Sequence, residues 1–284
     1  MSLDPRPFAE RLSAEIGLEF TGAEGRDGDG SRWLELCPAG HPVGQTFTLR
    51  TVVGWRRIDV YFKPGNFAGE LIEAMRQADE AGRKTFRVML GDCRNNGAEV
   101  LLTINGNLAD PESDAVWEAP WRTIDLAVRR GMLAINEGDA NSDRSQIEFW
   151  SSRAAAAVLA LLPLEYDDEP DPQAAGLPEG AKVRVEANRY ERDRRNRAAA
   201  LAIHGYSCLA CDVDMGRFYG EAAAGLIEVH HVVPVSEVGP GYIIDVEKDL
   251  VPLCPNCHAV AHRRSPPFTA QELRAMRQAA PAPD

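Results

Sequence analysis

The chain has 284 residues, of which 44% are hydrophobic and 26% charged, so it is long enough for two domains with buried cores. No stretch approaches 18 consecutive apolar residues and no signal peptide is recognisable, so we expect a cytoplasmic protein with no membrane contact. The formal net charge is −12. Residues 1–179 carry 18 basic and 30 acidic side chains, whereas residues 180–284 carry 13 of each. The acidic first part argues against a broad phosphate-binding face there.

Residues 1–164 have the pattern of an α+β domain, in which helices and a β-sheet share one core. Hydrophobic periodicity predicts helices over 5–16, 67–84, 123–133 and 145–162, strands over 33–37, 45–53, 55–62, 85–90 and 98–104, and a turn at 94–97. All five tryptophans lie in this part, at Trp33, Trp55, Trp117, Trp121 and Trp150. They can fill the core or form the walls of a pocket for a flipped base. We expect this domain to serve specificity, DNA recognition or partner binding.

An acidic segment with several Pro and Gly residues follows at 165–180, and we expect it to be an extended linker to a second domain over 181–284. The second domain opens with a basic cluster whose side chains include Arg189, Arg192 and Arg195. On a helix these arginines can grip DNA phosphates. They can equally form a solvated helix face that pairs with Glu191 and Asp193.

Two CxxC pairs, Cys208 with Cys211 and Cys254 with Cys257, are separated by 42 residues. Four thiolates satisfy the tetrahedral preference of zinc, and four-cysteine sites are usually structural. Free core cysteines are a weaker interpretation at this spacing, and so are disulfides in a chain with only six cysteines. Cys37 and Cys93 stand alone and are expected to be ordinary core thiols.

Four histidines lie among and after these cysteines, and they offer ligands for a second, open metal site. His258 and His262 are four residues apart, so on a helix both rings lie on one face. His230 and His231 are adjacent in an apolar run, and in a strand they point to opposite faces. One of them can bind an ion with the helix pair while the other faces the substrate as a base. His41 and His204 are expected to be surface residues.

The segments GYSCLAC at 205–211, IEVHHVVP at 227–234 and DLVPLCPNCH at 249–258 resemble an HNH endonuclease, and more narrowly the McrA-type restriction endonucleases that act on modified cytosine. The resemblance covers about residues 185–265 and implies a ββα-metal fold that holds a divalent ion against the scissile phosphate. It implies that His231 is the general base. It also implies that His230, His258 and His262 bind the catalytic ion and that the four cysteines form a zinc knuckle.

Asp249 stands where this family has the Asn of its name. An ionised Asp accepts hydrogen bonds but cannot donate them. Either Asp249 orients the loop that carries the base, or Asn256 does so, or Asp249 is a solvated charge at the start of a strand.

These features predict a metal-dependent DNA endonuclease, a restriction enzyme acting on double-stranded DNA and dependent on modified cytosine. Its expected cofactors are a structural Zn²⁺ and one catalytic Mn²⁺, Co²⁺, Ni²⁺, Mg²⁺ or Zn²⁺, with imidazole ligands favouring the transition metals. We expect a homodimer, because two strands need two such sites. Two alternatives are a non-catalytic zinc-stabilised DNA-binding or interaction module and an antibacterial nuclease toxin.

Overall fold

The computed structural model describes residues 4–16, 18–163, 193–233 and 242–279. The chain divides into two units, Met1–Leu164 and Glu165–Asp284. The predicted linker at 165–180 lies outside the described residues, as do Arg189 and Arg192. Among the described helices, none is long and apolar enough to cross a membrane.

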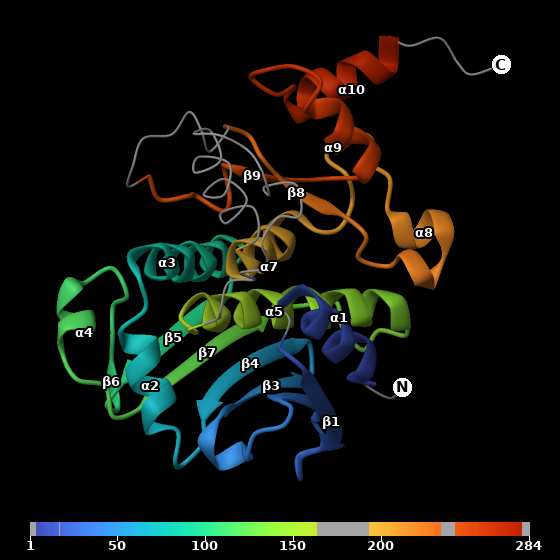
Figure 1. The fold of residues 1–284 in the computed structure, drawn as a ribbon. Coiled ribbons are helices and arrows are strands. Elements are labelled where there is room, and N and C mark those ends of the chain that lie inside the picture. Colours follow the sequence, from blue (N-terminus) through green and yellow to red (C-terminus); the bar gives the residue numbers. More distant parts are fainter. Residues whose placement is uncertain (1–3, 17, 164–192, 234–241, 280–284) are drawn as a thin grey trace. The chain divides into compact units, whose positions relative to one another are not determined.

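The first unit is built on a seven-stranded antiparallel sheet in the order β1-β2-β3-β4-β7-β5-β6. Its strands are β1 (Phe20–Arg26), β2 (Arg32–Pro38), β3 (Phe47–Gly54), β4 (Arg57–Pro64), β5 (Glu99–Ile104), β6 (Asn107–Leu108) and β7 (Ile124–Gly131). Its helices are α1 (Arg6–Ile16), α2 (Gly69–Arg76), α3 (Glu80–Asn95), α4 (Asp114–Glu118) and α5 (Ala140–Ala160), with a 3₁₀ turn at Val43–Gln45. Figure 1 shows α1, α3 and α5 along one face of the sheet.

Strict alternation of buried and half-buried side chains in β3 gives the sheet one core face. Phe47, Leu49 and Val53 point into that core together with Phe62 from β4. The alanines of α5 have side chains small enough for the helix backbone to approach the sheet closely. The other face of the sheet is consequently left to polar and aromatic side chains.

Three predictions for this unit were wrong. The helix predicted over 67–84 is two helices, because the Asp79 carboxylate accepts a hydrogen bond from the Gly82 amide at 2.7 Å and caps a new helix. The strand predicted over 85–90 is part of that second helix. The turn predicted at 94–97 is present, with the Gly97 amide donating to the Arg94 carbonyl at 2.8 Å, but a helix and not a strand precedes it. The helix predicted over 123–133 is β7, in which Ile124, Leu126 and Val128 are buried at a period of two.

The second unit contains a two-stranded antiparallel ribbon and several short helices. These are α7 (Arg194–His204), α8 (Met215–Tyr219), a 3₁₀ turn at Glu221–Ala223, β8 (Glu228–His231), β9 (Leu250–Leu253), α9 (Pro255–Ala261) and α10 (Ala270–Ala279). Leu201, Ile227, Leu253 and Leu273 form a small apolar core together with Cys208, Cys254 and Cys257. The order β8, β9, α9 is the predicted ββα unit, so the expected α+β class is confirmed for the chain.

Candidate metal centres and active site

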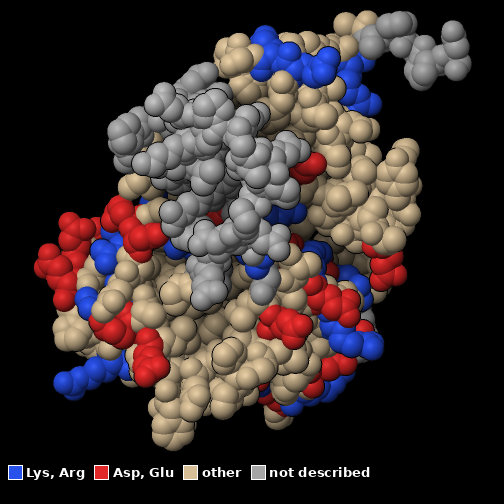
Figure 2. Space-filling view, in the orientation of Figure 1, with Lys and Arg blue, Asp and Glu red and all other residues tan. Residues whose placement is uncertain are grey.

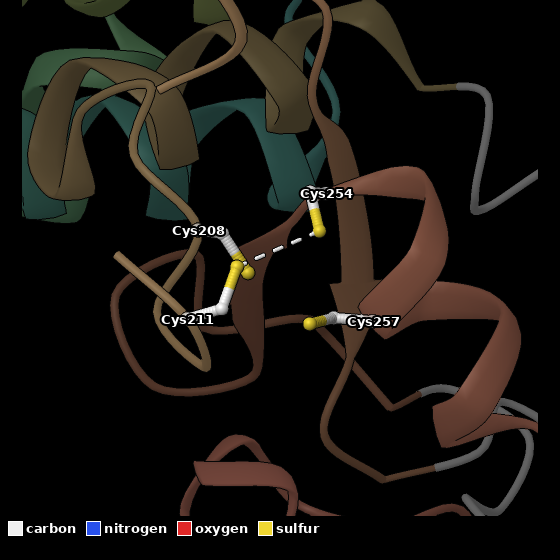
Figure 3. Close-up of side chains that lie close together, drawn as sticks. All are labelled: Cys208, Cys211, Cys254 and Cys257. Carbon is white, nitrogen blue, oxygen red and sulfur yellow. Dashed lines mark hydrogen bonds between the residues drawn. The ribbon is translucent and has the colours of Figure 1, made fainter. Parts of the chain in front are cut away.

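The four cysteines of the two CxxC pairs meet in one cluster (Figure 3). Cys208 and Cys211 lie in the turn after α7, where the Cys208 amide donates to the Val213 carbonyl and the Asp212 amide donates back to the Cys208 carbonyl. Cys254 is the N-cap of α9 and Cys257 lies in its first turn. All four sulfurs lie within 4.8 Å of one another.

This cluster fits a tetrahedral zinc ion. The Sγ atoms of Cys211 and Cys254 are 3.7 Å apart, and a regular tetrahedron with Zn–S bonds of about 2.3 Å has an edge of about 3.8 Å. Burial, followed by the neighbouring sulfurs, raises the pKa of the Cys257 thiol well above its usual range. Four crowded sulfurs of this kind become thiolates readily only when a cation compensates their charge.

Two arginines of α10 hold the first CxxC turn against the rest of the unit. Arg274 donates to the Leu209 carbonyl at 2.8 Å and pairs with Asp212 at 2.7 Å. Arg277 donates to the Cys211 carbonyl at 3.3 Å. The C-terminal helix therefore adds positive charge and hydrogen bonds where the thiolates of the cluster would gather.

His230, His258 and His262 form a second cluster, distinct from the cysteines. The Nε2 atoms of His258 and His262 are 3.2 Å apart, and the ring of His230 is centred 5.2 Å and 4.9 Å from those two rings. A tetrahedral ion with bonds of about 2.0–2.1 Å to nitrogen separates its ligands by about 3.3 Å, so this donor set fits a transition metal. His230 is buried and His262 is exposed, so the cluster is open on one side.

Burial first, and then the neighbouring histidines, lower the pKa of His230 to about 3. The imidazole is therefore neutral at neutral pH, which is the form that binds metal ions.

Glu228 belongs to this cluster and was missed in the sequence. Its Oε2 accepts a hydrogen bond from Nδ1 of His258, which leaves Nε2 of that ring facing His262. A carboxylate behind a ligating histidine fixes the tautomer and the orientation of the ring. The available signal was the spacing of Glu228 and His230, because residues i and i+2 of a strand share a face.

Replacing Glu228 with Gln is expected to weaken binding of Co²⁺ at the histidine cluster by about 10–100-fold, because the Nδ1 proton of His258 loses its charged partner. A Co²⁺ titration followed by its visible absorption measures this affinity in protein already loaded with zinc. The exposed Glu221 provides a matched control, and Glu221→Gln should bind Co²⁺ as the wild type does. Equal affinities in both variants would exclude the proposed role of Glu228.

His231 points away from the histidine cluster, as strand alternation requires. It is 6% exposed, and neither ring nitrogen has a hydrogen-bond partner among the described residues. Burial lowers the pKa of His231 to about 4, against an opposing effect of the Asp249 carboxylate. A neutral, buried, unsatisfied imidazole is costly in a core, and such groups are typical of functional sites.

This burial corrects one expectation. The sequence predicted that the second histidine of the pair would face the substrate, whereas in the structure both His230 and His231 are buried. The physical reason is the apolar run in which they lie, which draws the ribbon into the core.

Asp249 is tied to the residues before β9. Its Oδ2 accepts hydrogen bonds from the Tyr242 hydroxyl and the Asp245 amide, each at 2.7 Å. Its carbonyl accepts from the Val232 amide at 2.8 Å, next to His231. Asp249 therefore acts as the acceptor in each of these three hydrogen bonds, one of which holds the backbone next to His231. Asn256, the other residue considered for this role, is exposed on α9.

The basic residues are arranged differently from the predicted phosphate-gripping helix. Arg195 is buried at the start of α7, and its guanidinium donates to the Asp193 carboxylate at 3.1 and 3.3 Å. Figure 2 shows basic side chains gathered over α10 and the turn before it. Arg263 lies in that turn, exposed and directly after His262, so it is better placed than Arg195 to contact a phosphate.

Comparison with known proteins agrees with this geometry. Residues 219–264 match the sequence profile of the HNH endonuclease family. The C-terminal unit contains a domain that matches the HNH family model. The matched segment of this HNH domain includes both strands of the ribbon and all of α9, and thus the whole histidine cluster.

A segment of 89 residues is 36% identical to a type IV methyl-directed restriction enzyme, EcoKMcrA, of Escherichia coli strain K12. This segment spans 30% of the present chain and 30% of that enzyme. No solved structure matches the chain.

Proposed function

We propose that the protein is a metal-dependent DNA endonuclease of the restriction type. The observation that carries the proposal is the pair of clusters on α9. Four sulfurs fit a structural zinc at the start of this helix, and a separate, open cluster of three imidazoles lies along it. Closed sulfur sites are structural, whereas three-ligand sites with a vacant position are catalytic.

Phosphodiester hydrolysis needs an attacking water, a base and compensation of the charge that develops on the phosphate oxygens. A divalent ion held by His230, His258 and His262 would supply that compensation. His231 takes the proton of the water as the water oxygen bonds to phosphorus and the bond to the leaving oxygen breaks. Asp249 holds the backbone beside His231, and Arg263 contacts an adjacent phosphate.

The proposed substrate is double-stranded DNA that contains modified cytosine. This step rests on the similarity to the methyl-directed enzyme, which covers only the C-terminal part of the chain. The first unit, residues 1–164, would then supply recognition, with 165–180 as linker and 181–284 as nuclease domain. Two copies of the chain would act together, because each copy carries one histidine cluster among its described residues.

The burial of His231 favours a second candidate, a zinc-stabilised DNA-binding module without catalysis. A pure binder has no need of a base that can reach a water molecule, and the ring is covered in this structure. The two candidates differ in whether any bond is cut.

The deciding experiment incubates a plasmid carrying 5-methylcytosine and its unmodified counterpart with the protein and Mn²⁺, Co²⁺, Ni²⁺, Mg²⁺ or Zn²⁺. Gel electrophoresis should show cleavage of the modified plasmid only. Cleavage of both plasmids would exclude a dependence on modified cytosine but would still support an endonuclease. If neither plasmid is cut with any ion while both are bound, the non-catalytic module is the correct function.

A further inference from the structure

The face of the sheet opposite its helices holds a hollow of about 690 Å³. It lies over β2, β3 and β4 between two turns, at 27–31 and at 55–56. Cross-strand pairing places Arg50 opposite Tyr61, and Val52 opposite Asp59, on this one face. A volume of this size is in the range of pockets that enclose a small organic ligand.

Trp55 forms one wall of the hollow. It stands in the two-residue turn between β3 and β4 and is 81% exposed. The turn is fixed, because the Leu133 amide donates to the Arg56 carbonyl at 3.0 Å and Arg56 Nε donates to the Leu133 carbonyl at 3.3 Å. A large aromatic ring exposed on a fixed turn is a surface on which another flat ring can stack.

The polar side chains around the hollow are held in place before any ligand arrives. The guanidinium of Arg50 lies 4.4 Å from the ring centre of Trp33 and pairs with Asp27 at 2.6 Å. Arg57 pairs with Asp59 at 2.6 Å, and this carboxylate also lies 3.4 Å from the Tyr61 hydroxyl. The ligand would therefore meet ordered hydrogen-bonding groups, which lowers the entropy cost of binding.

The charges around the hollow favour a base over a phosphate as the part of a nucleic acid that binds there. Four carboxylates and three cations line it, and these are Asp27, Asp29, Glu35, Asp59, Arg50, Arg57 and Lys63. A surface with this balance repels a run of phosphates. Carboxylates instead accept hydrogen bonds from exocyclic amino groups, such as N4 of cytosine.

We propose that this hollow receives one base flipped out of DNA, a base that carries an amino group, stacked on Trp55 with its amino edge toward Glu35 and Asp59. The proposal rests on the proposed function, because the HNH domain is what brings DNA to this chain. It assigns to the first unit a recognition site for cytosine or adenine rather than for thymine, whose O4 would face the carboxylates. Flipping is required because the face of the base that would stack on Trp55 is covered by neighbouring bases in the duplex.

Binding is measured by fluorescence anisotropy with full-length His231→Ala protein, so that cleavage does not disturb the titration. The labelled probes are duplexes with one unpaired cytosine, adenine or thymine, and a fully paired duplex. Unpaired cytosine and adenine should bind about tenfold more tightly than unpaired thymine or the paired duplex. Trp55→Ala in the His231→Ala background should abolish that difference in affinity. Glu35→Gln in the same background should raise the affinity for unpaired thymine to that for unpaired cytosine.

Phe67→Ala is the matched control, because Phe67 is also an aromatic residue of the first unit, 80% exposed, and does not line the hollow. It should bind every probe as the His231→Ala parent does. Equal affinity of the parent for all four probes, or equal affinities of the Trp55→Ala and Phe67→Ala proteins, would overturn the assignment of this hollow. If no probe binds at all, the proposed function itself fails.

Discussion

Replacing His231 with alanine is expected to lower the rate of DNA cleavage by about 10²–10⁴-fold, the usual contribution of a positioned general base. The ring has no hydrogen-bond partner among the described residues, so its removal breaks no such contact. The rate is measured on supercoiled plasmid at saturating metal ion. Imidazole added to the His231→Ala protein should restore part of the activity, which a purely structural role would not allow.

His41 provides the control for this experiment, because it is an exposed histidine of the first unit. His41→Ala should cut at the wild-type rate and show no response to imidazole. Full activity of His231→Ala would remove the base from the mechanism. The histidine cluster would remain intact in that variant, so a group other than His231 would have to take the proton of the attacking water.

The largest effect on stability is expected for Cys208→Ala. Apparent free energies of binding for structural zinc are about 10–16 kcal/mol in small zinc-dependent domains, and this free energy contributes directly to folding. The cysteines make up much of the small core of the second unit, so loss of one ligand should release the zinc and unfold that unit. Elemental analysis should show one zinc ion fewer per chain, and hydrogen exchange should show lost protection in α9.

Cys37→Ser serves as the control, because Cys37 is a half-buried thiol of the first unit outside both clusters. It should retain its zinc and the protection of α9. A Cys208→Ala protein that remains folded and fully loaded with zinc would show that the four sulfurs do not hold the ion.

The sequence predicted the second unit better than the first because metal ligands are constrained by chemistry as well as by burial. The spacing of Cys208 and Cys211, and of His258 and His262, indicates the geometry of the ligands without knowledge of the surrounding fold. The strand at 124–131 gave no such signal, because its short buried run fits a helix as well as a strand until its neighbours are known. The sheet pairing of β7 with β4 and β5, far apart in the chain, decides between the two.

Two features of the candidate site could not be read from local patterns. Arg195 belongs to a basic run, but its pairing with Asp193, the N-cap of α7, depends on how that helix starts. The covered position of His231 depends on packing around the ribbon, which strand alternation alone does not give. Alternation predicted that the two histidines would diverge, and tertiary packing determined how much of each ring solvent can reach.

The helix α9 and its two cap residues, Cys254 and His262, together provide two of the four sulfurs and two of the three imidazoles. Loss of the ion at the sulfur cluster should therefore also disturb the histidine cluster. A chelator strong enough to strip the thiolate-bound ion should also displace the imidazoles, and adding back manganese alone should not restore metal binding at the histidine cluster. Oxidants that attack the sulfurs should have the same effect, so oxidation should abolish the proposed cleavage activity together with metal binding at both clusters.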